Sequence, residues 1–187
     1  MANEINLATG KRAERKLLIT VAEWDGTKYG GTSTDREILG VRTEDSSIEF
    51  NPDVETSTDI RGITYTDVNK TEPQQDFDPY NILGGSKLAS YLTQAALVND
   101  IQAYNNAFKV YVITAFIGSA GSHYAVRHDG CSIIPTSLGG DSYTQMPIEV
   151  HFSNDITEGT VNGGDDGKLS TTFEFTPKSS SAFSDGD

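Results

Sequence analysis

The segment from Ile63 to Gln74 constrains the fold most, because it has the composition of a β-strand but no side that could be buried. Successive side chains of a strand point to opposite faces. One alternating set holds Ile63 and Tyr65 followed by polar residues and Pro73, and the other holds Val68 among Thr, Lys, Glu and Gln residues. Neither set makes a core. The segment is therefore not expected to bury either side in the core of its own chain.

Negative charge is concentrated around the same segment. The chain has 27 Asp and Glu residues against 14 Lys and Arg, a formal net charge of −13. Residues 44–78 hold ten of the acids and only two bases, Arg61 and Lys70. Because affinity for phosphate depends on Lys and Arg, this composition argues against specific binding of nucleic acid or of an anionic membrane.

Length and cysteine content suit a single domain in a reducing compartment. The 187 residues are enough for one domain with a sizeable core. The single cysteine, Cys131, excludes an intrachain disulfide. No apolar run precedes the charges of residues 1–16, which predicts no signal peptide, and no stretch approaches 18 apolar residues, which predicts no membrane insertion.

Alternating hydrophobicity predicts several short strands. Residues 107–117 are apolar on both alternating sets, as in a strand buried on both sides. Asp129-Gly130 is expected to be a turn between two strands, and the polar residues 52–59 and 154–167 are expected to be loops. The ribbon of residues 60–81 contains Pro73 and Pro79, which favour an edge strand or an irregular stretch, with an irregular end at 74–78. The expected strands are 16–24, 36–43 with a continuation at 46–51, 107–117, 122–128, 131–135, 146–153 and 168–176.

One helix is predicted at about residues 86–99. Gly84-Gly85 breaks the chain, Ser86 can cap, and apolar residues follow at helical spacing. We therefore predict a mainly β fold, a β-sandwich or half-barrel with one flanking α-helix. Its core is expected to be one cluster, covered by Leu88, Tyr91, Leu92 and Ala95 and made of Phe108, Val110, Val112, Ile148, Val150, Phe152, Phe173 and Phe175.

No motif predicts catalysis, a cofactor or a metal. Residues 26–33 approach the phosphate-binding loop pattern, but Thr32 stands where that pattern has lysine, so a plain turn is the better interpretation. His123, His128 and His151 lack metal-ligand spacing. The acids of residues 163–168 lack the spacing of a calcium loop. We therefore expect a protein that is not an enzyme.

The stretch "EILGVRTEDSSIEFNPDVETSTDIRGITYTDVNKTEPQQDFDPYNI", residues 37–82, resembles the major tail tube proteins of long-tailed, siphovirus-like bacteriophages. The later helix "SKLASYLTQAAL" and strand "AFKVYVITAFI" add to the likeness, which covers about residues 16–177. It implies a tail-tube β-domain at residues 16–177. The polar composition without periodicity on either side of that domain predicts a flexible N-terminal arm (1–15) and a mobile acidic tail (178–187). The resemblance further implies stacked hexameric rings, with a long loop at about 43–61 that reaches the adjacent ring through Asn51, Pro52, Asp53, Val54, Glu55, Thr56, Ser57, Thr58 and Asp59.

The same resemblance implies a channel through which viral DNA passes without specific binding. An acidic lumen repels DNA, and we expect that lumen to include Asp67, Glu72, Glu149 and Glu174. The implied partners are further copies of the chain and other tail proteins, namely the tape measure, tail terminator and baseplate or tip. The implied location is the virion tail, and the host cytoplasm before assembly.

Two other readings of the sequence remain open. The chain could form the inner tube of a contractile tail or of a phage-derived bacteriocin, which needs the same ring and channel. It could instead be a non-catalytic β-domain that binds or decorates another structure as a monomer or small oligomer. Rings or tubes in micrographs distinguish the tube readings from the last one.

Overall fold

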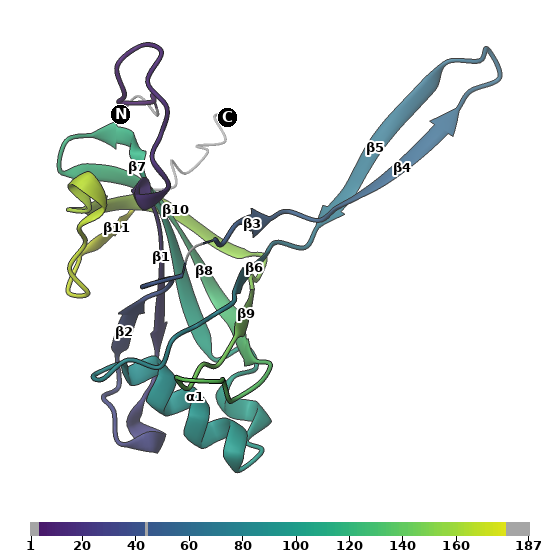
Figure 1. Cartoon of the computed structure of the whole chain (residues 1–187). Coiled ribbons are helices and arrows are strands. Elements are labelled where there is room, and N and C mark those ends of the chain that lie inside the picture. Colours follow the sequence, from purple (N-terminus) through teal and green to yellow (C-terminus); the bar gives the residue numbers. More distant parts are fainter. Residues whose placement is uncertain (1–3, 44, 179–187) are drawn as a thin grey trace, which may run out of the picture.

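The computed structural model describes residues 4–43 and 45–178 and is built mainly of β-strands (Figure 1). One α-helix, α1 (Lys87–Leu97), and four short 3-10 turns complete the secondary structure of these residues. The turns are η1 (Arg15–Leu17), η2 (Thr27–Tyr29), η3 (Ile101–Ala103) and η4 (Asp165–Gly167). The strands are β1 (Leu18–Trp24), β2 (Asp35–Ile38), β3 (Ile48–Glu49), β4 (Pro52–Thr58), β5 (Thr64–Thr71), β6 (Gln74–Phe77), β7 (Phe108–Ser119), β8 (Ser122–Pro135), β9 (Ile148–His151), β10 (Asp155–Asn162) and β11 (Phe175–Pro177).

Nine of these strands form one antiparallel sheet, in the order β2-β1-β7-β8-β9-β6-β3 with β10 and β11 on a branch. The branch exists because β8 is long enough to pair with two successive strands along the same edge. Its first part pairs with β10 and its last part pairs with β9. β4 and β5 pair only with each other. The predicted mainly β fold with a single flanking helix is confirmed.

The sheet curls on itself, so a half-barrel rather than a sandwich describes it. β1 and β6 are separated by three strands in the sheet order. Nevertheless, the buried Thr20 hydroxyl donates to the Gln75 side-chain oxygen across 2.9 Å. Gln75, fully buried on β6, also donates to Ser46 Oγ at 3.0 Å. Buried polar groups need hydrogen-bond partners. These two bonds can form only while the sheet is curved enough to bring β1 and β6 together, so they stabilise the curvature.

Buried residues form two clusters, one on each face of the sheet, and the predicted single core is wrong. The concave face holds Phe108, Val110, Ile148 and Val150 with the helix residues, and Phe152 packs against them. Phe173 belongs to the cluster on the convex face, where Phe175 packs beside it. Pairing in the sheet separates the two sets, because neighbouring residues of β1 and β7 point to opposite faces.

Helix α1 is confirmed, and it closes one end of the half-barrel (bottom of Figure 1). Ser86 Oγ accepts the Ala89 amide at 3.1 Å, which satisfies one of the free amides of the first turn. Its apolar side is buried in the concave cluster through Leu88, Ala89, Tyr91, Leu92 and Ala95.

Four predicted assignments are wrong, and each depends on which segments pair with one another. Residues 52–59 are mostly strand β4, because β5 pairs with them. Gly130 is not a turn; it lies in a register shift of the continuous strand β8, with φ 78°. Residues 155–162 of the predicted loop are β10, and of the predicted strand 168–176 only Phe175 and Thr176 are paired.

The predicted irregular end of the ribbon is also wrong. Residues 74–77 are the strand β6, which lies between β9 and β3 inside the sheet. Phe77 is 1% exposed and packs in the concave cluster. The ribbon is therefore divided, because its first part leaves the body and its last part enters the core.

Candidate functional site

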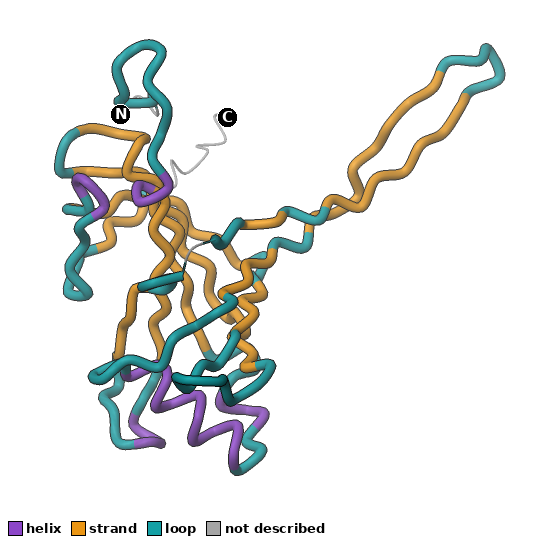
Figure 2. The backbone as a smooth tube through the Cα atoms, in the orientation of Figure 1, coloured by secondary structure: helices purple, strands orange, loops and turns teal. Residues whose placement is uncertain are grey.

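A two-stranded hairpin projects away from the body and contacts it only at its base (Figures 1 and 2). We call residues 51–72 the projecting hairpin. Every residue of β4 and β5 is exposed. At about 3.3 Å per residue, the eight residues of β5 extend about 26 Å. An isolated two-stranded hairpin is marginally stable in water, so this segment is suited to pairing with something outside the chain.

Asp59 organises the tip of the hairpin. Its Oδ1 accepts the amides of Arg61 at 2.8 Å and of Ile63 at 3.0 Å. These bonds, that from the Ile63 amide first, hold the pKa of the Asp59 carboxyl below its usual value. Gly62 has a φ of 79°, which a residue with a side chain seldom adopts. Ile60 is fully exposed at this turn, so the tip presents an apolar side chain to solvent.

The hairpin has two chemically different faces. Cross-strand partners share a face, so the register places valines and threonines together on one side and carboxylates on the other. The Val/Thr face consists of Val54, Thr56, Thr58, Thr64, Thr66 and Val68. The acidic face consists of Glu55, Ser57, Tyr65 and Asp67, with Glu55 directly opposite Asp67.

Contacts at the base hold the hairpin to the sheet. The Asn51 side chain donates to the Glu72 carbonyl at 3.2 Å, and the Glu72 amide donates to the Phe50 carbonyl at 3.1 Å. Further back, Arg15 donates from Nε and Nη2 to the Ser46 carbonyl at 3.1 and 2.7 Å. The root of the hairpin is thus tied to the residues that precede β1.

An open apolar groove lies beside this root. It is the part of the concave face that helix α1 leaves uncovered, and its volume is about 520 Å³. Its lining comes from β1, β7, β8, the residue after β9 and the residues flanking the hairpin, chiefly Leu18, Phe50, Val112, Phe116, Val126 and Phe152. Large apolar grooves open to water are typical of binding surfaces.

A carboxylate-bearing face lies on the convex side of β3, β6 and β9. Asp76 is paired with Glu149, and Glu49 with Gln74, so all four side chains share one side of the sheet. The intervening Gln75 and Val150 point inward and are fully buried. We call this surface the acidic sheet face and define it by Glu49, Asp76 and Glu149.

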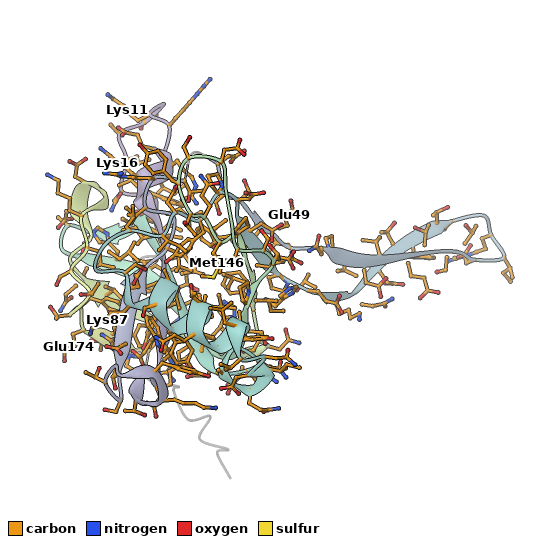
Figure 3. The ribbon with its side chains drawn as sticks, turned by 60° about the horizontal axis from the view of Figure 1, so that its bottom comes forward. Lys11, Lys16, Glu49, Lys87, Met146 and Glu174 are labelled. Atoms are coloured by element: carbon orange, nitrogen blue, oxygen red, sulfur yellow. The ribbon has the colours of Figure 1, made fainter. Side chains whose placement is uncertain are left out.

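The structure separates the residues predicted as lumen acids. Asp67 lies on the acidic face of the hairpin, and Glu72 lies at its base, 2.6 Å from Lys70 Nζ. Glu149 lies on the acidic sheet face. Glu174 precedes β11 on the side of the body away from the hairpin (Figure 3). Their place in a lumen stays a prediction, since it depends on how copies are arranged.

The predicted contact residues from Asn51 to Asp59 fall on β4 and its two ends. Sequence reasoning missed that β5 pairs with these residues, and it did not bring Glu49 and Asp76 together on one sheet face. Matching the alternation of 52–58 against that of 64–71 could have found the two faces of the hairpin. The acidic sheet face had no such local signal, since its strands are distant in the sequence.

The two ends of the chain are described only in part. Of the predicted N-terminal arm, residues 1–3 lie outside the described residues, whereas Ile5 bridges to Ile117 on β7. Of the predicted acidic tail, only Lys178 is described, and its amide donates to the Glu158 carbonyl at 2.8 Å.

The described part of the chain holds neither a cluster of metal ligands nor a helix that could span a membrane. No three or more His, Cys, Asp or Glu residues gather there as metal ligands do. No helix among residues 4–43 and 45–178 has the length and apolar character needed to cross a membrane.

Comparison with solved structures gives a weak likeness. No family model matches the chain, and no curated protein matches it. The chain is similar to one chain of a solved structure described as "Cryo-EM Structure of an Extracellular Contractile Injection System, PVC sheath-tube complex in extended state". The identity is 13%, the match covers 80% of this chain and 93% of that chain, and the TM-score is 0.43.

Proposed function

We propose that this chain is a non-catalytic structural protein of a phage tail, in which six copies form a ring and stacked rings form the tail tube. The tube is the conduit through which DNA leaves the particle. The proposal covers a siphovirus-like, non-contractile tail, with the tape measure, terminator and tip proteins as partners at the tube's length and ends. The chain would be made in the host cytoplasm and then become part of the virion tail.

The projecting hairpin is the observation that carries this proposal. Its 15 strand residues are all exposed, so the body of the same chain stabilises none of them by burial. Ordering a residue costs about 1–2 kcal/mol of backbone conformational entropy. Contacts within the chain offset little of this free-energy cost for the hairpin. Contacts with a neighbouring molecule are therefore expected to offset the rest. Subunits of a tube offer such a neighbour to every copy.

Free sheet edges support repeated association. β2 and β3 end the main sheet, and within the described residues neither has a partner on its outer side. Open edges expose unpaired amides and carbonyls, which pair readily with another chain. A closed ring in which sheets meet edge to edge removes this hazard from each copy.

The acidic sheet face suits the wall of a DNA channel. Glu49, Asp76 and Glu149 would place three carboxylates per copy on one surface. Duplex DNA carries one negative charge per roughly 1.7 Å of its axis, so such a wall repels it and lets it slide. The repulsion remains effective near the wall, since the Debye length is about 8 Å at physiological salt.

Electron microscopy of the purified full chain in negative stain tests the proposal. We expect rings with six-fold symmetry or tubes that lengthen with protein concentration. Particles that stay monomeric at every concentration would contradict the proposal and favour a binding or decoration domain. The inner tube of a contractile tail would use the same surfaces, and micrographs of whole particles with or without a sheath separate the two tail types.

A further inference from the structure

We propose that the Val/Thr face of the projecting hairpin docks into the apolar groove of a second copy of this chain, while the acidic face stays in solvent. The proposal rests on the proposed self-assembly and specifies the two surfaces that meet. It assigns opposite roles to adjacent residues of β4, because Thr56 belongs to the docking face and Ser57 does not. It therefore narrows the contact implied by the resemblance, which included every residue from Asn51 to Asp59.

The groove is chemically suited to an apolar strand surface rather than to a polar small molecule. Sites for small ligands combine apolar walls with a few polar groups that remain available to the ligand. Here the polar lining groups are largely occupied within the chain. Arg15 bonds the carbonyls of Ser46 and Leu18, His128 Nδ1 lies 2.8 Å from the Ser153 carbonyl, and the Thr114 hydroxyl donates to the Tyr124 carbonyl.

The Val/Thr face has the complementary chemistry. Val54 and Val68 are directly opposite each other and are 50% and 61% exposed. The threonines beside them add methyl groups, and the hydroxyls of Thr58 and Thr64 lie 3.3 Å apart, close enough to bond to each other. Removing a face of this kind from water costs little free energy, and covering the apolar groove residues lowers the free energy further.

The occupant has to come from another molecule. The hairpin starts at the rim of its own groove, where Phe50 and Pro73 line it, and runs away from the body (Figure 1). Paired strands cannot bend back over the point from which they start, so a chain cannot fill its own groove. Every copy therefore has one hairpin to donate and one groove to fill.

The distribution of charge also favours a second copy of this chain as the partner. Residues 51–72 contain five acids and two bases. Residues 11–16 contain four bases and one acid, and Arg15 of this segment lines the groove. Figure 3 shows Lys11 and Lys16 together at one end of the body. The acidic hairpin of one copy is thus attracted towards the basic segment beside another copy's groove, as in electrostatically steered association.

The first experiment compares Thr56→Asp with Ser57→Asp in the full chain. The two variants add one negative charge to neighbouring, exposed positions of the same strand, but on opposite faces. Since an unpaired charge is strongly disfavoured in an apolar site, Thr56→Asp is expected to raise the concentration needed for assembly about ten-fold or more. Ser57→Asp is expected to assemble like the unaltered chain.

Thiol labelling of assembled protein supplies the second readout. Single cysteines are placed at Ser47 in the groove, at Thr56 and at Ser57, all exposed in the single chain. The native Cys131 adds little background, because it is fully buried and burial raises the pKa of its thiol. On assembly, labelling at positions 47 and 56 is expected to slow about ten-fold or more, while position 57 stays reactive.

The outcomes separate this inference from the proposed function. If the unaltered chain forms tubes but Ser57→Asp inhibits assembly as strongly as Thr56→Asp, the docking face is wrong and the tube proposal stands. The same conclusion follows if position 47 remains fully reactive in tubes. If the unaltered chain forms no assembly at any concentration, both proposals are overturned.

Discussion

The body of this protein and its projecting hairpin are made of the same kind of structure, antiparallel β-strands, but they obtain their stability differently. β7 is flanked by two strands and contributes to both buried clusters, through Phe108 to one and Ile113 to the other. β5 has one neighbour and no buried residue. The comparison indicates that a strand can be specified by its turn and its cross-strand partner without burial in its own chain.

The largest expected effect is on the body. Phe108 is 1% exposed between Trp24 and Tyr91, with ring centroids 6.1 and 6.2 Å away. Phe108→Ala is expected to lower the free energy of unfolding by about 3–5 kcal/mol, because it removes buried contacts and leaves a cavity. Urea denaturation followed by circular dichroism measures this change.

Phe50→Ala is the matched control for the same side chain in an exposed position. Phe50 is 65% exposed at the root of the hairpin, and its removal is expected to change the stability of the single chain by no more than about 0.5 kcal/mol. Equal losses for the two variants would show that the stability of the single chain does not come from the side chains buried in the body.

A smaller effect is expected at the charged network on the convex face. The nearly buried Glu23 carboxylate accepts bonds from Arg36 Nε at 2.5 Å and from the Tyr111 hydroxyl at 3.0 Å. Arg36 also donates to the Phe173 carbonyl at 2.8 Å and so links the C-terminal residues to the sheet. Since bonds to charged groups contribute about 1.5–3 kcal/mol, Glu23→Gln should lower the free energy of unfolding by about that amount.

The corresponding hairpin variant is Glu72→Gln. The Glu72 carboxylate pairs with Lys70 in solvent, and exposed ion pairs contribute little. Its substitution is expected to leave the unfolding curve unchanged. A measurable loss at Glu72 together with none at Glu23 would reverse the comparison.

At the hairpin tip the expected effect is local and pH-dependent. The pKa of Asp59 is lowered from 3.8, chiefly by the bond from the Ile63 amide. A lowered pKa means that the ionised carboxylate holds the turn at pH values above 3.8 and releases it as the pH falls through the lower, folded value. The amide resonance of Ile63 should therefore titrate with a midpoint below 3.8 in nuclear magnetic resonance spectra.

Asp59→Asn is the control for this titration, because the amide side chain keeps an acceptor oxygen but cannot ionise. The Ile63 resonance of this variant should show no such transition. A midpoint at or above 3.8 in the unaltered chain would show that the turn does not depend on the Asp59 carboxylate.

The smallest expected effect on the body comes from the largest change to the chain. Replacing residues 52–71 by two glycines removes both strands of the hairpin but no member of either buried cluster. The free energy of unfolding is expected to stay within about 0.5 kcal/mol, while assembly is lost. Calorimetry and electron microscopy of the same sample measure both. A large drop in the melting temperature would show that the body depends on the hairpin.

The sequence predicted those elements whose signals are local. Helix α1 followed from the break before Ser86 and the helical spacing of Leu88, Tyr91 and Leu92. β7 followed from a continuous apolar run. The exposure of residues 64–71 followed from two alternating sets that are both polar.

What could not be predicted depends on pairing between distant segments. β10 has few apolar residues, and it is a strand because β8 offers a free edge to it and because Gly159 lets the Thr176 backbone approach closely. The acidic sheet face exists because three separate strands bring Glu49, Asp76 and Glu149 to one side. The groove appears only once the helix is seen to cover part of the concave face and to leave the rest open.

Hydrogen exchange of the hairpin, measured by mass spectrometry on free monomer and on assembled protein, tests the central claim most directly. If the hairpin depends on a neighbouring copy, peptides from residues 52–71 exchange rapidly in the monomer, because solvent-exposed bonds open easily, and become strongly protected in the assembly. Peptides from β7 should be protected in both states. Strong protection of the hairpin in the monomer, or rapid exchange that persists after assembly, would contradict the account.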